Sequence, residues 1–319
     1  MKARILSALR QTPGPAFRTI RFLFLLMIPV SLAVMLLDES GLLFWFAYFA
    51  APLMGFIGLP GEAALVFLTS ILLNIYSTIA VIQGLNFSPR DIIILATLCT
   101  IAHSFIIEGV ILKKTGSSFF IISLLRFLSA IAAAWVLNLI LPAAYIPQET
   151  AAVLPGAVGI AHEELPRILQ VWLFSSLFLA VKIGLIILAI IFSQKLLEEF
   201  GIMKILGQAM APVMRPLGLS GNTGYLWIVA NVIGLAFGSA VLIEKIRSGS
   251  LSRQEAFLFN HHVAVSHSQL EDNFLFAAIG APFFWVALPR FFMAIIVVWL
   301  TKGCLAFRAR QPKAAGDSG

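Results

Sequence analysis

The chain has 319 residues, of which 60% are hydrophobic and only 12% are charged. Soluble domains contain about 25% charged residues, so this composition excludes a soluble enzyme and predicts a protein that crosses a lipid bilayer several times. The formal net charge of +7 does not indicate a nucleic-acid partner, because the basic residues are spread over short loops and form no continuous stripe.

The N-terminal segment carries five basic residues ahead of the first long apolar run, which ends at Leu36-Leu37-Asp38-Glu39. A cleaved signal peptide has a shorter apolar core and a small-residue cleavage site. We therefore interpret this run as a retained first membrane helix.

Apolar runs of about the length that spans a bilayer recur along the whole chain. They are 20–37, 42–58, 62–85, 91–112, 119–143, 168–194, 202–217, 222–243, 254–279 and 283–301. The weakest run, 202–217, contains Lys204 and Gln208. The expected fold is an all-α polytopic membrane protein of about ten transmembrane or re-entrant helices. The sequence does not decide whether segments 42–58 and 202–217 cross the membrane or re-enter it.

The distribution of basic residues predicts the orientation. If the N-terminus is cytoplasmic and all ten runs cross, 15 basic residues lie on the cytoplasmic side and 3 on the other, as the positive-inside rule requires. We therefore expect a multi-pass protein of the bacterial inner (plasma) membrane with both termini in the cytoplasm. The expected segments are a basic N-terminus (1–19), a first repeat (20–143), a non-cytoplasmic loop (144–166), a second repeat (167–302) and a cytoplasmic tail (303–319).

The two halves of the chain resemble each other. Residues 36–61 and 196–221 are identical at ten of 26 positions without a gap, at a spacing of 160. At a spacing of 164, residues 116–135 match 280–299, and the dipeptide His103-Ser104 matches His267-Ser268. Five crossings in each copy would place the copies upside down relative to each other, as in many secondary transporters.

These paired blocks resemble the gate, or nucleoside-recognition, domain of concentrative nucleoside transporters, the ferrous-iron permease and the spore maturation proteins A and B. The resemblance covers chiefly 36–136 and 196–300, and it is closest to stand-alone gate proteins because the chain has no P-loop. The run Asn231-Val232-Ile233-Gly234 matches the start of an Asn-x-x-Gly stretch in the spore maturation proteins, but Gly238-Ser239-Ala240 replaces their Ala-Thr-Pro. The resemblance implies membrane transport or membrane assembly and does not identify a substrate.

Polar residues inside the apolar runs mark candidate sites, because inserting an ionisable group costs about 2.5–3.5 kcal/mol. His267 and Glu271 are four residues apart and share a helix face, whereas His103 and Glu108, five apart, share one only loosely. Such groups suit a divalent metal, a proton relay, a polar organic ligand or hydrogen bonds between helices. The candidate substrate or ion site comprises His103, His262, His267, Glu271, Asn231 and Asn74; the candidate metal ligands are His103, His267 and Glu271.

Two arginines inside apolar runs require carboxylate partners. Glu108 lies eight residues before the turn at Gly116 and Arg126 ten after it, so both reach similar depths at 1.5 Å per residue. Asp272 and Arg290 flank the equivalent glycine by the same counts. We predict the ion pairs Glu108–Arg126 and Asp272–Arg290, one toward each membrane face, each of which pins a helical hairpin.

Three functions fit these features. The first is a permease that moves a small polar, nucleoside-like solute or an ion by alternating access between two inverted repeats. The second is a non-transporting gate-family protein in envelope or spore-type assembly, acting as a homo-oligomer or with a partner gate protein, and the third is a divalent metal-ion permease. No cofactor is certain; a divalent metal or a coupling proton or cation is the class indicated. No catalytic motif is present, so an enzyme is not expected.

Overall fold

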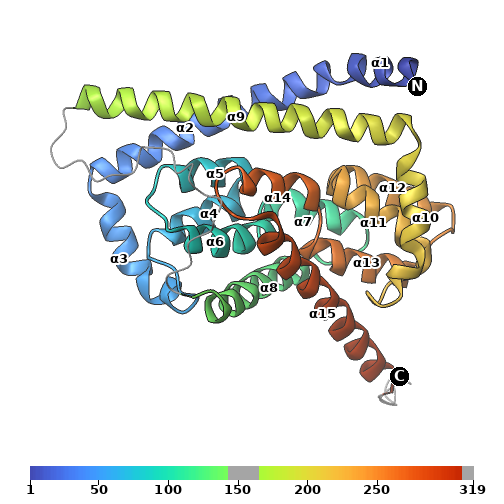
Figure 1. Cartoon of the computed structure of the whole chain (residues 1–319). Helices are drawn as coiled ribbons and strands as arrows, with labels where there is room; N and C mark the ends of the chain where they lie inside the picture. Colours follow the sequence, from blue (N-terminus) through green and yellow to red (C-terminus); the bar gives the residue numbers. More distant parts are fainter. Residues whose placement is uncertain (143–164, 311–319) are drawn as a thin grey trace, which may run out of the picture.

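The computed structural model describes residues 1–142 and 165–310, and every regular element in these ranges is a helix. The first half contains α1 (Lys2–Gln11), α2 (Pro13–Glu39), α3 (Leu42–Gly55), α4 (Ala63–Leu72), α5 (Ile75–Gln83), α6 (Pro89–Ile101), α7 (Phe105–Lys114) and α8 (Phe119–Ile140). The second contains α9 (Leu165–Glu199), α10 (Ile202–Met214), the short η1 (Gly221–Thr223), α11 (Gly224–Val232), α12 (Leu235–Arg247), α13 (Arg253–Val265), α14 (Gln269–Ala277) and α15 (Phe283–Arg310). The expected all-α class is confirmed (Figure 1).

Some of the expected segment boundaries fall beyond these ranges. The connecting loop was predicted at 144–166. Residues 144–164 lie outside the described residues, and α9 begins at Leu165. The predicted tail begins at 303, but 303–310 continue α15 as helix, and 311–319 lie outside the described residues.

Five helical segments are long and apolar enough to cross a membrane, judged by length and composition. They are Lys2–Glu39, which joins α1 and α2, Pro89–Lys114, which joins α6 and α7 across a break, Phe119–Ile140, Pro166–Glu199 and Phe283–Phe307. Apolar helices of 10–17 residues form at Leu42–Gly55, Ala63–Leu72 and Ile202–Met214. The described residues therefore contain fewer full-length spans than the ten expected, because several of the expected runs are built from two short helices each.

Four expected runs, 62–85, 91–112, 222–243 and 254–279, are interrupted near their centres. The interruptions separate α4 from α5 at Leu73 and Asn74, α6 from α7 at 102–104, α11 from α12 at Ile233 and Gly234, and α13 from α14 at 266–268. Hydropathy does not reveal these breaks, because the sequence on both sides stays apolar. A non-helical backbone at membrane depth is stable only where protein groups satisfy its hydrogen bonds.

The two histidine-serine dipeptides adopt the same unusual conformation at their breaks. Ser104 has φ 47° and Ser268 has φ 50°, and they are the two non-glycine residues with positive φ among the described residues. Positive φ is uncommon for residues with a side chain. The backbone N–H of Ser104 donates to Ser70 O, and that of Ser268 donates to Ala230 O, both at 2.9 Å. Each break is therefore fastened to the end of a neighbouring interrupted helix.

The two buried arginines complete this fastening. Arg126 Nε donates to Ile101 O at 2.9 Å and its Nη2 donates to His103 O at 2.8 Å. Arg290 Nη2 donates to His267 O in the same way. Carbonyl groups at a helix end lack intrahelical partners, so each arginine supplies the donors that a broken helix needs in an apolar environment.

The same contacts recur in both halves at the spacings found in the sequence. Ser70 and Ala230 are 160 residues apart, and Ser104 and Ser268 are 164 apart. The spacing of 160 also relates the left-handed glycines Gly41 and Gly201, and Gly58 and Gly218; the spacing of 164 relates Gly116 and Gly280, and the capping serines Ser88 and Ser252. The sequence repeat is thus also a repeat of local structure.

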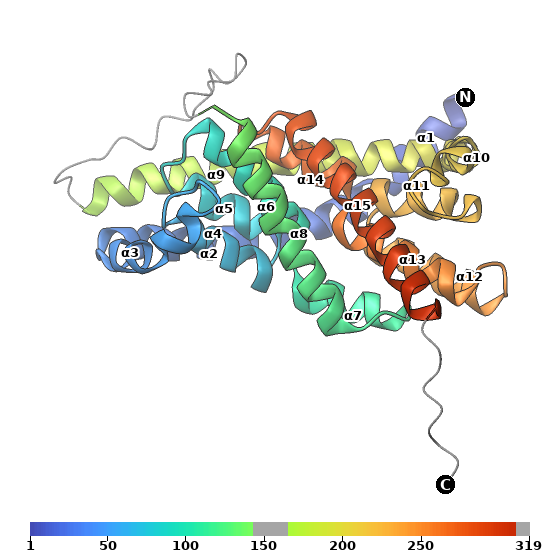
Figure 2. The same cartoon turned by 90° about the horizontal axis from the view of Figure 1, so that it is seen from below.

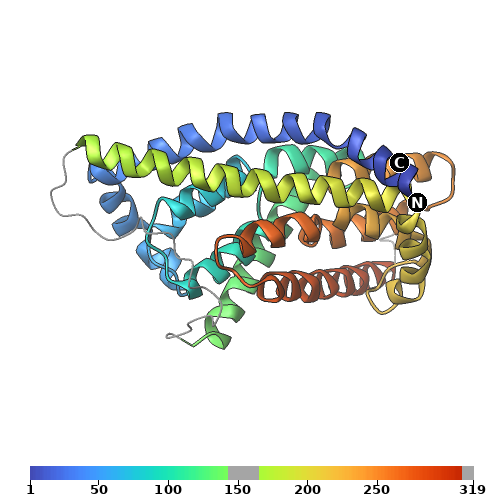
Figure 3. The same cartoon turned by 45° about the horizontal axis from the view of Figure 1, so that its top comes forward.

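Equivalent long helices pack against each other in opposite directions. Helices α2 and α9 lie side by side in Figure 3: Gln11, which ends α1 just before α2, bonds to Glu199 at the end of α9, and Ser31 of α2 bonds to Ser176 in the first half of α9. Helices α8 and α15 lie next to each other in Figure 2 and together line an apolar groove. The core lies around α6, whose residues 93–101 are all buried, and large apolar side chains of α3 and α8 face outward, as lipid contact requires.

Candidate functional site

Two histidines and one carboxylate meet where the interrupted helices of the two halves come together. Glu108 Oε1 lies 3.0 Å from His103 Nε2 and 3.1 Å from His267 Nε2. The two imidazole rings have centroids 5.1 Å apart. Both histidines are buried, with 6% and 1% of their surface exposed. This cluster of His103, Glu108 and His267 joins the first-half break to the second-half break.

The break itself brings Glu108 to the histidines. Along an unbroken helix His103 and Glu108 would share a face only loosely, because five residues correspond to about 500° of rotation. The left-handed Ser104 redirects the chain, so that Glu108, in the first turn of α7, lies beside the preceding His103. Its second oxygen, Oε2, lies 2.7 Å from Arg126 Nη2.

The backbone determines which nitrogen of each histidine carries a proton. His103 Nδ1 lies 3.3 Å from Cys99 O and 3.1 Å from Thr100 O, and His267 Nδ1 lies 2.7 Å from Val263 O. Carbonyl oxygens only accept hydrogen bonds, so Nδ1 is the donor in both rings. In neutral histidines, each Nε2 therefore presents a lone pair toward Glu108.

The second predicted ion pair is also present. Arg290 Nη2 lies 3.0 Å from Asp272 Oδ2, and its Nη1 donates to Asn273 Oδ1 at 3.2 Å. The structure therefore brings both predicted arginine–carboxylate pairs within ion-pair distance. Their function, pinning each hairpin or taking part in transport, stays a prediction.

Among the described residues, Glu271 forms no hydrogen bond or ion pair with His267, although the sequence predicts that the two share a helix face. The i, i+4 spacing requires a continuous helix, and the break at 266–268 ends α13 before His267. Glu271 instead accepts a hydrogen bond from the hydroxyl of Tyr76, at the start of α5. The carboxylate between the two histidines is Glu108, which replaces Glu271 in the predicted ligand set.

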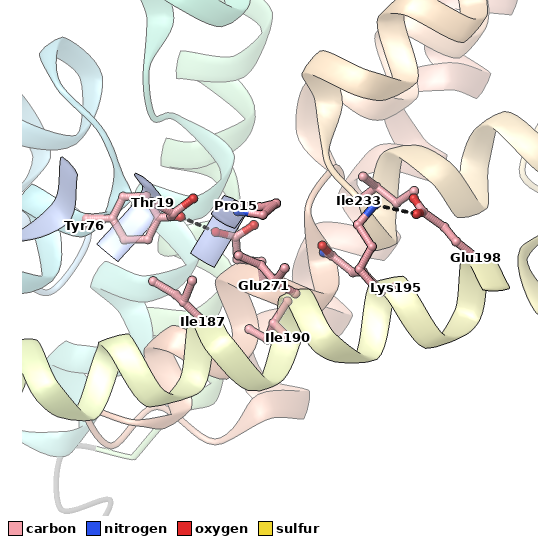
Figure 4. Close-up of a pocket in the computed structure, with 11 residues that line it drawn as sticks. Pro15, Thr19, Tyr76, Ile187, Ile190, Lys195, Glu198, Ile233 and Glu271 are labelled. Carbon is pink, nitrogen blue, oxygen red and sulfur yellow. Dashed lines mark hydrogen bonds and ion pairs between the residues drawn. The ribbon is translucent and has the colours of Figure 1, made fainter. Parts of the chain in front are cut away.

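A pocket of about 380 Å³ lies beside these breaks. Figure 4 shows Tyr76 and Glu271 directed toward each other, with Lys195 paired to Glu198 on α9 at 2.7 Å. The pocket is lined by Pro15, Thr19, Tyr76, Ile187, Ile190, Ile191, Gln194, Lys195, Glu198, Ile233 and Glu271. Its walls thus combine α2, α9 and residues at three of the four interruptions.

The remaining predicted residues lie outside this lining. His262 Nε2 accepts a hydrogen bond from Trp227 Nε1 at 2.8 Å, and Asn231 Nδ2 donates to Trp227 O at 2.9 Å. Asn74 caps α5 by accepting from the N–H groups of Tyr76 and Ser77. Of the six residues expected around one cavity, His103 and His267 lie in the cluster and Glu271 lines the pocket, whereas the other three bond within or between helices.

Sequence reasoning missed several polar residues of the pocket. Tyr76 stands within an apolar run and carries no charge, so nothing in the pattern distinguished it. Gln194 is the last residue of the apolar run 168–194 and Lys195 follows it, so neither stood out as a site residue. Gln194 Nε2 donates to Val232 O at the end of α11, which only the packing of α9 against α11 reveals.

Comparison with known proteins gives two matches. Residues 180–298 match the Gate family, which is described as nucleoside recognition. The chain is also 27% identical over 282 residues to the uncharacterized membrane protein YvoD of Bacillus subtilis (strain 168), an alignment that covers 88% of this chain and 89% of that protein. No solved structure matches the chain.

Proposed function

We propose that this membrane protein, whose residues 180–298 match the Gate family, is a permease for a small polar solute. One observation carries the proposal: four interrupted helices break next to a buried polar cluster and a polar pocket. Discontinuous helices of this kind form substrate sites in secondary transporters, because their free backbone ends bind polar groups within the membrane.

The pocket suggests the chemistry of the solute. Its volume of about 380 Å³ falls in the usual range for small-molecule sites. Tyr76, Gln194 and Lys195 offer donors, whereas Glu198 and Glu271 offer acceptors. This mixture suits an uncharged or zwitterionic molecule of about nucleoside size, with several hydroxyl or amide groups, better than a simple anion.

Alternating access would come from movement of the two halves against each other. The recurring contacts at spacings of 160 and 164, and the opposite directions of α2 and α9, support two copies related by inversion. Both termini would face the cytoplasm of a bacterial plasma membrane, because this orientation places 15 basic residues inside and 3 outside.

A thermal-shift screen of the purified full-length protein tests solute binding directly. Nucleosides and other polar solutes are added at about 100 times the dissociation constant, where binding stabilises the folded state by about 2.7 kcal/mol. The variant Glu271→Gln should lose most of this shift, because Glu271 lines the pocket. Glu39→Gln, at the exposed end of α2, is the matched control.

A shift that Glu271→Gln leaves unchanged would place the solute elsewhere. If no polar solute raises the melting temperature, the permease proposal fails, and the alternative of a non-transporting assembly protein gains support.

A further inference from the structure

We propose that His103, Glu108 and His267 form a binding site for a first-row divalent transition metal ion that joins the two halves of the protein. The three ligand atoms are His103 Nε2, His267 Nε2 and Glu108 Oε1, which all lie within 4.8 Å of one another. This resident ion is distinct from the solute of the proposed function and does not depend on that function.

The Nδ1 protons of the two histidines leave both Nε2 atoms directed at the Glu108 carboxylate. Both Nδ1 atoms donate to backbone carbonyls, so when the rings are neutral both Nε2 lone pairs face a carboxylate oxygen 3.0 and 3.1 Å away. Three acceptor atoms that face one another repel unless a positive charge lies between them. A metal ion bound to all three atoms would remove this repulsion.

The donor set matches the chemistry of the proposed ion. Two imidazoles and one carboxylate are the ligands of zinc in several enzymes and of non-haem iron(II). Ligands about 2.0–2.1 Å from a tetrahedral ion lie roughly 3.3–3.4 Å apart. The two separations between Glu108 Oε1 and the imidazole nitrogens, 3.0 and 3.1 Å, come within a few tenths of an ångström of this value, and the two nitrogens lie within 4.8 Å of each other.

Each ligand also has the outer support that metal sites require. The histidine rings are oriented by Nδ1 hydrogen bonds to Thr100 O and Val263 O, and Glu108 Oε2 is held by Arg126 at 2.7 Å. Such outer contacts set the tautomer and the direction of the ligand lone pairs. The Glu108 side chain retains 12% exposure, so one of the three ligands is not fully enclosed by protein.

The neighbouring arginines do not exclude a cation. Glu108 pairs with Arg126 through Oε2 and faces the histidines through Oε1, and Asp272 pairs with Arg290, so each guanidinium group has a carboxylate partner beside the proposed ion. The ligands come from both halves, with His103 and Glu108 in the first and His267 in the second. An ion bound here would therefore couple the breaks of α6–α7 and α13–α14.

Metal binding to the full-length protein in detergent tests the site. The protein is stripped with a chelator, dialysed against Co²⁺ or Zn²⁺, and analysed for bound metal and for the visible absorption of Co²⁺. We expect about one ion per chain. The double variant His103→Gln/His267→Gln should bind at least about 100-fold more weakly, since loss of outer-shell contacts alone costs 10–100-fold.

The matched control is His261→Gln, which removes a histidine of α13 whose Nδ1 also contacts a carbonyl but which lies outside the cluster. This control should bind metal like the unaltered protein. Equal binding by the double variant, or no binding by the unaltered protein, would overturn the proposal.

A second measurement needs no variant and so does not depend on a mutant that folds. Zinc X-ray absorption of the loaded protein should show two imidazole nitrogens and one oxygen at about 2.0–2.1 Å. Scattering without imidazole would contradict the assignment. Neither measurement involves solute, so failure here and failure of solute binding are separate results.

Discussion

The two halves of this protein share a scaffold but differ in the polar residues at the tips of their broken helices. In both, a left-handed serine bonds to the end of the preceding broken helix, and an arginine binds the carbonyl of the adjacent histidine. The equivalent carboxylates differ by one methylene: Glu108 in the first half and Asp272 in the second. The longer side chain, Glu108, contacts Arg126 and both histidines. Asp272 forms an ion pair with Arg290 and none with the histidines among the described residues.

The short helices after these breaks differ even more. Helix α14 begins with Gln269, Glu271, Asp272 and Asn273, whereas α7 has exposed Ile106 and Ile107 in its first turn. The pocket accordingly uses Glu271 of α14 but no residue of α7. The interruptions thus recur in both copies, whereas the polar residues beside them differ between the copies.

The largest effect is expected from breaking an ion pair. Glu108→Ala should destabilise the folded protein by about 3–5 kcal/mol, because it leaves Arg126 buried without a carboxylate. Asp272→Ala should cost less, since Asn273 Oδ1 still accepts from Arg290. The yield of monodisperse protein and its melting temperature measure the difference. The exchange Glu108→Arg with Arg126→Glu should recover part of the loss; a double variant no better than either single change would refute the pairing.

A smaller effect is expected at the left-handed serines. Glycine adopts this conformation without the cost of about 1–2 kcal/mol that a side chain pays, so Ser268→Gly should raise the melting temperature. Ser104→Gly should gain less, because it also removes the hydrogen bond from Ser104 Oγ to Leu73 O at 3.0 Å. Thermal unfolding of both variants checks the order. Destabilisation by Ser268→Gly would show that this serine has a further role.

The smallest effect concerns the breaks after α4 and α11. Asn74 caps α5 with its side chain, whereas the equivalent Gly234 has none. Asn74→Ala should therefore cost about 1 kcal/mol, as for other N-caps. Asn74→Asp, which keeps the accepting oxygen, is the control for melting measurements. An alanine variant as stable as the aspartate variant would exclude a capping role.

Much of the scaffold was predictable from the sequence, because its signals are local or repeated. Composition indicated an all-helical membrane protein, and counting from the turn at Gly116 paired Glu108 with Arg126. The matched His-Ser dipeptides placed His103 and His267 in equivalent helices, and the structure brings their rings together.

The site was less predictable, because it depends on backbone conformation and on packing between distant segments. Positive φ at a serine has no sequence signature, so the breaks after His103 and His267 were read as continuous helix. A continuous helix would place Glu271 beside His267, and the sequence assigned Glu108 only to the ion pair with Arg126. Tyr76 and Lys195 line one pocket only because α9 packs across the broken helices.

Solute uptake into proteoliposomes tests the central claim, that the interruptions of the two halves form a transport site. The account predicts saturable uptake of the solute found by thermal shift, and a loss of at least about 10-fold in Tyr76→Phe and Glu271→Gln. These changes remove the hydroxyl and the carboxylate that join α5 to α14 across the pocket. The Glu39→Gln control should transport normally. Uptake by both pocket variants at the rate of the unaltered protein would contradict the account.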